Sequence, residues 1–331
     1  QTYRTRLTGP PFFDILFLML DRFFRGKAHH TKKKNPWLFI AIALIAVGVF
    51  LGFYFAIRGR SAKNSISRSA LAKVWNSGNN IEQTLSEAQK AIESYPFDEY
   101  YLSICGIAYY YSALNAQEEE IRQQELEEAV IALRKALAVG LPSRMKGQVY
   151  YILAKAYYQK GEPWFDLAER YFLLAKESGS KEKDIPQYLA IVYAGRKDYS
   201  RAVSWFELAL ENNTSDALLL SAAISYMNTD QIEKARDLLL RLESSASDAK
   251  IRLKATLLLA QDNFNSGDIQ SAQDRYQGVL KEDPVNVDAW YGLGLIYAKL
   301  NDQLGARAAF RKVVQIDPNH ADARRRLAEK L

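Results

Sequence analysis

The chain has 331 residues, of which 48% are hydrophobic and 25% charged, so it can bury a sizeable core and is not a disordered chain. Its formal net charge is +6, but residues 1–63 hold eleven Lys or Arg against two Asp, a net charge of +9 that leaves −3 for the rest. This uneven distribution argues against a nucleic-acid partner for the large C-terminal part.

Residues 1–35 are expected to form a basic segment beside a membrane. Within it, residues 11–24 are apolar and aromatic but interrupted by Asp14, Asp21 and Arg22, and their apolar core is too short to span a bilayer. An interfacial amphipathic helix with aromatic side chains at the lipid headgroups fits this pattern. The alternative is a helix that docks on a neighbouring membrane protein.

Residues 36–58 are predicted to form a transmembrane helix. Residues 37–57 contain no charge and would make about 32 Å of helix, the thickness of the hydrocarbon core. Lysines at 32–34 precede this stretch, and Arg58 and Arg60 follow it. A cleaved signal peptide is disfavoured because the stretch is too long and no small-residue cleavage site follows. A buried soluble helix of this length and uniform apolarity would be unusual.

Small residues line one face of the predicted membrane helix. Gly48, Gly52 and Ala56 recur at intervals of four, which would let a second helix approach closely. They are the candidate residues of a transmembrane dimer face, and a homo-oligomer is one expected state. The alternative is that glycine and alanine are simply common in membrane helices.

Positively charged residues near the membrane helix favour a cytoplasmic N-terminus and a translocated C-terminal domain. We therefore expect a single-pass protein of a bacterial inner membrane, with residues 59–64 as a linker and the large domain in the periplasm. The alternative places this domain in the cytosol.

Residues 65–320 repeat with a period near 34 residues. Successive spacings of 3, 1, 3, 9, 4, 3 and 5 separate Trp290, Leu293, Gly294, Tyr297, Ala306, Phe310, Val313 and Pro318. This pattern resembles the tetratricopeptide repeat family, which places Trp, Leu, Gly and Tyr on one helix and Ala, Phe, Ala and Pro on the next. Seven such copies are expected, at about 65–98, 99–146, 147–182, 183–215, 216–252, 253–286 and 287–320, with a capping helix at 321–331.

The predicted fold class is all-α: a single transmembrane helix followed by an α-solenoid of about seven helical hairpins and a capping helix. Each hairpin leaves apolar surface that only the next hairpin can cover, so several must stack. An ordinary helical bundle is disfavoured because it would not explain the recurring pattern. The second copy fits only with about eleven extra residues between its helices, where helix extension is the expected outcome.

The family resemblance implies a concave surface, lined by the first helix of each hairpin, that receives a peptide or a partner helix. We call the residues at the family's groove positions the predicted groove set. It comprises Tyr110, Tyr111, Tyr151, Lys155, Tyr158, Ile191, Leu220, Ile224, Met227, Gln261, Phe264, Tyr291 and Lys299. Their aromatic and aliphatic character predicts an apolar extended or helical ligand. The alternative is that these side chains pack internally against neighbouring helices.

A carboxylate clamp of Lys, Asn and Arg, used by some family members for chaperone C-termini, has no counterpart at these positions. The sequence also shows no motif for catalysis, metal binding or nucleotide binding. The three histidines, His29, His30 and His320, lack metal-ligand spacing, and Gly292 and Gly294 lack the context of a dinucleotide motif. The single cysteine, Cys105, falls at a packing position. No catalytic residue, metal, cofactor or small-molecule substrate is therefore predicted.

The expected function is that of a membrane-anchored scaffold or adaptor that binds other proteins, contacts lipid through its anchor and organises a bacterial cell-envelope or motor-associated complex from the periplasm. Three alternatives remain open: a cytosol-facing receptor for soluble clients, an accessory subunit that positions an enzyme, and a structural oligomer-forming subunit of a larger machine.

Overall fold

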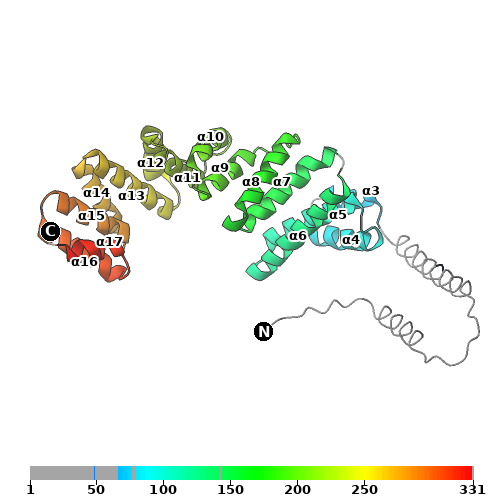
Figure 1. Ribbon diagram of the computed structural model, residues 1–331, viewed down its shortest axis with the longest axis horizontal. Coiled ribbons are helices and arrows are strands. Elements are labelled where there is room, and N and C mark those ends of the chain that lie inside the picture. Colours follow the sequence, from blue (N-terminus) through cyan, green and yellow to red (C-terminus); the bar gives the residue numbers. More distant parts are fainter. Residues whose placement is uncertain (1–47, 49–65, 77–79, 142, 330–331) are drawn as a thin grey trace, which may run out of the picture. The chain divides into compact units, whose positions relative to one another are not determined.

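The computed structural model describes Gly48 and residues 66–76, 80–141 and 143–329 (Figure 1). The chain divides into two compact units, residues 1–61 and 62–331, and every described residue except Gly48 belongs to the second unit. The predicted interfacial helix, the predicted dimer-face residues Gly52 and Ala56, and all of the predicted membrane helix except Gly48 lie outside the described residues. Gly48 itself is helical.

The described part of the second unit consists of fifteen α-helices and one short 3-10 helix, with no strand. This confirms the all-helical class that the sequence predicts. The helices are α3 (Arg68–Asn76), α4 (Ile81–Ser94), α5 (Glu99–Asn115), α6 (Glu119–Val139), α7 (Ser143–Gln159), η1 (Glu162–Trp164), α8 (Phe165–Glu177), α9 (Ile185–Gly195), α10 (Tyr199–Leu210), α11 (Asp216–Met227), α12 (Ile232–Ser245), α13 (Ala249–Ser266), α14 (Ile269–Glu282), α15 (Val287–Lys299), α16 (Gln303–Ile316) and α17 (Ala321–Ala328).

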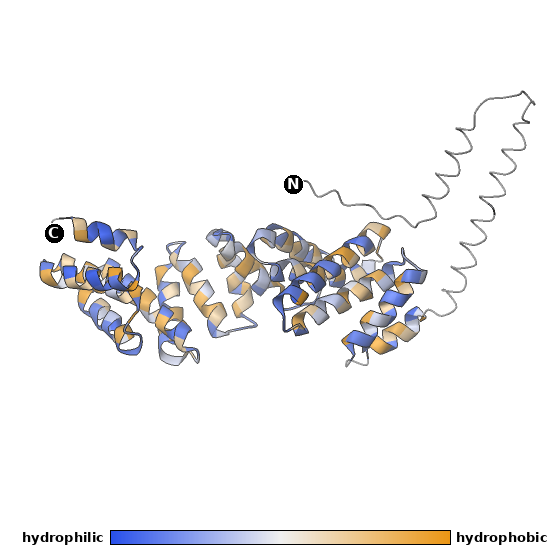
Figure 2. Cartoon of the chain, turned by 90° about the horizontal axis from the view of Figure 1, so that it is seen from below, coloured by the Kyte–Doolittle hydropathy of each residue, from blue (hydrophilic) through white to orange (hydrophobic). Residues whose placement is uncertain are grey.

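None of these described helices combines the length and apolarity that crossing a membrane requires. Polar and apolar residues are mixed along these helices, as the orange and blue segments in Figure 2 show. Small side chains recur where helices of one hairpin meet: Ala88, Ala129, Ala168, Ala202 and Ala306 are all fully buried. Their small volume lets paired helices approach closely.

Consecutive helices pack on each other along the whole row from α3 to α17 (Figure 1). The odd-numbered helices make a second set of contacts, because α5 packs on α7, α7 on α9, α9 on α11, α11 on α13 and α13 on α15. No pair of described even-numbered helices packs to this extent. The odd-numbered helices, which are the first helices of the hairpins, therefore form the inner and more tightly spaced layer of the stack.

Two glycines of α15 show how the repeat pattern is enforced by packing. A Cβ atom at Gly292 would lie 2.2 Å from the Tyr276 ring of α14, and one at Gly294 would lie 2.5 Å from the Phe310 ring of α16. Large rings on the second helices thus fill the space that glycines on the first helix leave free. These contacts explain the two glycines as packing residues.

The insertion in the second hairpin lengthens its helices. α5 continues to Asn115 and α6 begins at Glu119, so the added residues form helix instead of a long loop. Inside this extension the Ser112 hydroxyl donates to Glu125 at 2.7 Å, and Arg122 binds Glu119 at 2.6 Å. The first bond joins α5 to α6, whereas the second is an i,i+3 pair within α6, of a kind that stabilises a helix by a few tenths of a kcal/mol.

Candidate functional site: the inner face of the first helices

All members of the predicted groove set lie on odd-numbered helices, but their exposure differs. Tyr110 and Tyr151 are buried, at 1% and 6% of their maximal exposure, whereas Gln261 and Lys299 are exposed. The others are half-buried, namely Tyr111, Lys155, Tyr158, Ile191, Leu220, Ile224, Met227, Phe264 and Tyr291. Close spacing of the odd-numbered helices explains why the two tyrosines are covered. Whether the set contacts a partner stays a prediction.

Asp184 is the residue around which several members of this set assemble, and its position at the start of α9 is unusual. Aspartates at the starts of α5, α10, α13, α14 and α16 accept a hydrogen bond from a backbone N–H of their own helix. Asp184 makes no such bond because its own backbone is helical, with φ −89° and ψ −4°. Its carboxylate is therefore free to bind side chains of α7.

Two side chains of α7 hold this carboxylate. The Tyr151 hydroxyl donates to Asp184 Oδ2 at 2.7 Å, and Lys155 Nζ lies 3.4 Å from the same oxygen. Lys155 Nζ also donates to the Tyr151 hydroxyl oxygen at 3.0 Å. The three groups form a closed triangle in which the ammonium neutralises the carboxylate.

Aromatic rings surround the triangle. Lys155 Nζ lies 5.1 Å from the Tyr151 ring centre and 4.8 Å from that of Tyr188, distances typical of cation–π contacts. The Tyr188 ring packs edge-on against Tyr158 at 4.9 Å and stacks on Phe172 at 5.3 Å. We call Tyr110, Tyr151, Lys155, Asp184 and Tyr188 the polar node, which α5, α7 and the start of α9 bring together.

Burial keeps two tyrosines of the polar node, Tyr110 and Tyr151, protonated. Burial, followed by the hydrogen bond to Asp184, raises the pKa of Tyr151 well above its usual value. Burial also raises the pKa of Tyr110, with smaller contributions from Tyr188, Tyr111 and Asp184. Burial alone would lower the pKa of Lys155, but Tyr188 and Asp184 outweigh it and raise this pKa. Tyr110 and Tyr151 are therefore neutral phenols, and Lys155 is an ammonium, at physiological pH.

Two atoms of the node lack a hydrogen-bond partner although they are buried: the Tyr110 hydroxyl and Asp184 Oδ1. Unpaired buried polar atoms are rare and each one requires an explanation. Asp184 is one of the groups that raise the pKa of Tyr110, after burial, Tyr188 and Tyr111.

An apolar stretch follows the node along the inner layer. Ile191 and Met227 pack against the central core, and Leu220 packs against the neighbouring cluster of α11–α13. Ile224 is half-buried and belongs to none of the core clusters that the described residues form. It is thus the aliphatic side chain of this stretch most available to a partner.

The C-terminal members of the set contact their neighbours. Lys299 Nζ lies 4.9 Å from the Phe264 ring centre, and the Tyr291 ring lies 5.6 Å from Phe310 and 4.9 Å from His320. Each of these contacts joins different helices of the stack or a helix and the turn beside it. Gln261 binds Asn265 on its own helix at 3.1 Å.

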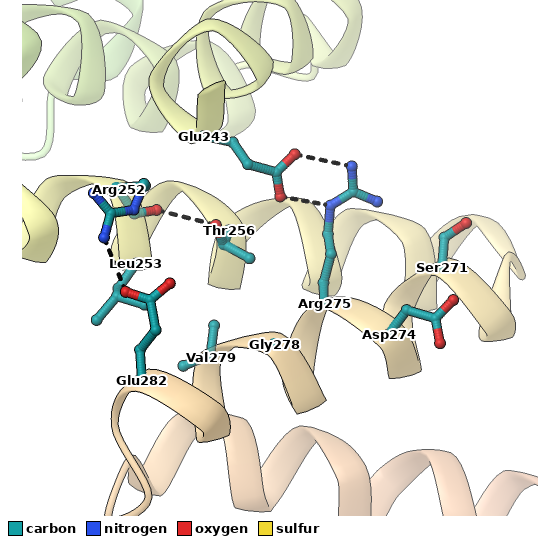
Figure 3. Close-up of a pocket in the computed structure, with 10 residues that line it drawn as sticks. All are labelled: Glu243, Arg252, Leu253, Thr256, Ser271, Asp274, Arg275, Gly278, Val279 and Glu282. Atoms are coloured by element: carbon teal, nitrogen blue, oxygen red, sulfur yellow. Dashed lines mark hydrogen bonds and ion pairs between the residues drawn. The ribbon is translucent and has the colours of Figure 1, made fainter. Parts of the chain in front are cut away.

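A cavity of about 470 Å³ lies elsewhere, between α12, α13 and α14 (Figure 3). Four of its five charged side chains pair with each other: Arg275 binds Glu243 at 3.0 Å, and Arg252 binds Glu282 at 2.8 Å. The fifth, Asp274, accepts a hydrogen bond from Gln270 at 2.9 Å. The cavity is therefore lined by satisfied ion pairs, unlike the polar node. Among the described residues, no group of three or more His, Cys, Asp or Glu side chains is arranged to hold a metal ion.

Sequence reasoning missed two node residues, Asp184 and Tyr188. Asp184 occupies the second position of its repeat, which belongs to the family's groove positions, but it looks like an ordinary helix cap. Tyr188 is at the sixth position, where no groove residue is expected. The signal that could have found them was the unusual concentration of tyrosines in this part of the chain.

The C-terminal part of the chain matches a known sequence family. Residues 257–328 match the model of the family described as tetratricopeptide repeat. Protein bimA of Emericella nidulans is 25% identical over 171 residues, which are 51% of this chain and 20% of that protein. The chain thus spans about a fifth of the length of this curated relative.

Two solved structures resemble the fold. The C-terminal part of a TPR repeat-containing protein from Cytophaga hutchinsonii has a TM-score of 0.53 and 14% identity, over 79% of this chain and 99% of that one. The apo form of the quorum sensor NprR from B. thuringiensis has a TM-score of 0.52 and 17% identity, over 78% and 80%. Residues 257–328 therefore carry tetratricopeptide repeats, and the described part of the second unit is an α-solenoid of tetratricopeptide-repeat type.

Proposed function

We propose that the chain is a membrane-anchored scaffold whose first helices bind a peptide or helix of a partner protein. The observation that carries this proposal is the row of mostly half-buried side chains on the odd-numbered helices. In this row Ile224 belongs to none of the core clusters that the described residues form. Half-buried apolar and aromatic side chains can bury further area on binding at low cost in side-chain entropy. Tetratricopeptide repeat proteins are generally scaffolds without catalytic activity, and the same role is proposed here.

A finer part of the proposal concerns location. The uncharged stretch at 37–57 and its flanking cations support a single transmembrane helix, and the charge distribution favours a periplasmic solenoid. We place the protein in a bacterial inner membrane, where it organises a cell-envelope or motor-associated complex. Protease protection of a C-terminal tag tests this topology. Digestion in spheroplasts but not in intact cells is expected, and protection in spheroplasts would favour a cytosol-facing receptor.

The binding role is tested by affinity capture from cells with the full-length chain and two matched variants. Ile224→Asp places a charge within the row on α11, whereas Leu240→Asp changes an exposed leucine, at 42% of its maximal exposure, on the second helix α12. The proposal expects loss of the captured partners with Ile224→Asp and their retention with Leu240→Asp. Unchanged capture by both variants would favour a structural oligomer, in which the inner row is not used.

A further inference from the structure

The second helices of the hairpins form an outer layer whose charge changes from one end of the stack to the other (Figure 1). In α6 five Glu stand against three Lys or Arg, a net charge of −2, and α4 has three Glu and one Lys, also −2. Acidic and basic residues balance in each of α10, α12 and α14. α16 has two Arg, one Lys and no acidic residue, a net charge of +3. The described outer layer thus has an acidic end and a basic end.

The cations of the basic end are not neutralised within the described part of the chain. Arg311 and Lys312 are exposed on α16 and form no ion pair with any residue that the structure describes. The adjacent α17 adds three Arg against one Asp. In the preceding hairpin, by contrast, Arg275 of α14 binds Glu243 of α12 at 3.0 Å. The charges on α16 therefore remain available to carboxylates from outside the chain.

An exposed leucine lies on the same face of α16. Exposed residues follow one another along this face at intervals of four, three and four, namely Leu304, Ala308, Arg311 and Gln315. Leu304 is 85% exposed. The face thus combines one large apolar side chain with cations, which suits a partner helix that offers acidic and apolar side chains at a similar spacing.

The outer face of α6 offers that combination. Its exposed residues at intervals of four, four and three are Glu120, Gln124, Glu128 and Ile131. Ile131 is 38% exposed, and neither glutamate forms an ion pair with a described residue. α6 has 21 residues, against 14 in α4 and 13 in α8, so it is longer than the second helices on both sides. The insertion in the second hairpin therefore gives the acidic end an extended helical face.

Charge and composition favour a second copy of the chain over other anionic partners. A membrane-surface helix buries a row of large apolar side chains, but Leu304 is the only large apolar residue of the described α16 that is exposed. A nucleic acid would be repelled by the other end of the same stack, because residues 81–139 contain eleven Asp or Glu against four Lys or Arg. A second copy turns this asymmetry into complementarity, since its acidic end fits the basic end of the first.

We propose that the outer face of α16 binds the outer face of α6 in a second copy of the chain, so that copies associate head to tail. Arg311 and Lys312 then pair with Glu120 and Glu128, while the exposed apolar side chains of the two helices pack together. Because the two surfaces differ, each added copy leaves one surface of each kind free, and the row can grow. The inference goes beyond the proposed function, because it uses the second helices and leaves the inner row of the first helices open to a partner.

Sedimentation velocity of the full-length chain in detergent micelles tests this association. The average mass should rise with protein concentration in about 50 mM NaCl but not in about 500 mM NaCl, because salt screens exposed ion pairs. A transmembrane dimer would add the same mass to every sample and would not respond to charge variants of the solenoid. An average mass that is independent of concentration in low salt would overturn the inference.

Charge reversal at the two ends identifies the surfaces. Arg311→Glu with Lys312→Glu, and separately Glu120→Lys with Glu128→Lys, should each abolish the rise in mass. An equimolar mixture of these two double variants should regain it, because the reversed basic end of one fits the reversed acidic end of the other. A mixture that stays dissociated would mean that the two surfaces do not meet, and the inference would fall.

Arg241→Glu with Lys281→Glu is the matched control, because it makes the same change in net charge as the basic-end variant on exposed side chains of α12 and α14. It should leave the association unchanged. An equal loss with this control would show that net charge alone matters and would overturn the assignment to α16. Circular dichroism melting checks that each variant is folded, as expected for substitutions at exposed positions.

Photocrosslinking in cells distinguishes a second copy from another partner. A benzophenone amino acid at Ala308, on the exposed face of α16, should yield a species of twice the mass of the chain, with the crosslink in α6 of the second copy. Crosslinks to other proteins alone would overturn the inference and assign the basic end to a different acidic partner. Loss of captured partners with Ile224→Asp is a separate readout, so the proposed function stands or falls independently.

Discussion

The middle and the C-terminal end of the solenoid are built from the same helical hairpin, but their cores are connected differently. Between α5 and α12 most of the buried side chains form one cluster that includes Tyr110, Tyr151, Phe172 and Phe206, and a smaller cluster joins α11, α12 and α13. From α13 to α17 they form smaller clusters, each confined to adjacent helices. The C-terminal end follows the family pattern closely, whereas the middle departs from it by its tyrosines and its insertion.

The two regions show two ways in which hairpins of a repeat protein pack on each other. At the C-terminal end, small residues face large rings, as Gly294 faces Phe310. The apolar surface of each hairpin is covered by the adjacent hairpins. In the middle, aromatic side chains join several hairpins into one core and also hold a polar node with two unpaired atoms. The C-terminal repeats thus pair small residues with large rings, whereas the middle repeats also bury polar atoms of Tyr110 and Asp184 without hydrogen-bond partners.

The largest expected effect comes from truncating one buried ring in each region. Phe172→Ala and Phe310→Ala each remove a fully buried phenylalanine and should cost about 3–5 kcal/mol of unfolding free energy. Hydrogen–deuterium exchange should show that Phe172→Ala exposes amides from α5 to α10, while Phe310→Ala exposes only α15–α17. Loss of protection across α5–α9 in Phe310→Ala would show that the two regions are equally coupled.

A smaller effect is expected from the tyrosine hydroxyls of the node. Tyr151→Phe removes a hydrogen bond to a charged group and should lower the unfolding free energy by about 1.5–3 kcal/mol. Tyr110→Phe removes an unpaired hydroxyl and should be neutral or stabilising. Urea unfolding of the two variants provides the comparison. Equal destabilisation by both would mean that Tyr110 is paired in solution.

Substitutions of two glycines, Gly292 and Gly278, test how tightly the C-terminal helices pack. Gly292→Ala places a methyl group against the Tyr276 ring and should cost about 1–3 kcal/mol. Gly278 lies in α14 with open space where its Cβ would be, so Gly278→Ala should stabilise the helix by about 0.5–1 kcal/mol. Urea unfolding measures both, and a destabilising Gly278→Ala would contradict this description of the packing.

The smallest effect at neutral pH concerns two acidic groups, one from each region. Burial raises the pKa of Cys105 to about 12 and that of Tyr276 to about 12. Because the folded state holds these protons more tightly than the unfolded state, their contribution to stability is complete below the unfolded pKa values of about 8.5 and 10. It is lost as the pH rises toward 12.

Thermal melting at pH 8 to 11 should therefore show a falling midpoint, and Tyr276→Phe should reduce the slope. Iodoacetamide offers a direct check on Cys105, which should react with the folded chain at pH 8.5 far more slowly than with the urea-unfolded chain. Rapid labelling of the folded chain would contradict the burial of this thiol.

The sequence predicts the helical class and the packing positions because these depend on local spacing. Ala306 and Phe310, for example, stand at repeat positions and are fully buried. It could not predict that Tyr110 and Tyr151 would be covered, because their exposure depends on how closely the odd-numbered helices approach. Nor could it predict the role of Asp184, because the helical backbone of this residue and the missing N–H of Pro186 both disfavour a cap on α9, while the carboxylate binds α7.

The central claim is that the inner row of the first helices contacts a partner protein, and site-specific photocrosslinking in living cells tests it most directly. A benzophenone amino acid would replace Ile224 on the inner row or Leu240 on the second helix of the same hairpin. We expect a discrete crosslinked species of higher mass from position 224 and none from position 240. Crosslinks from position 240 without any from position 224 would contradict the claim and place the contact surface on the second helices.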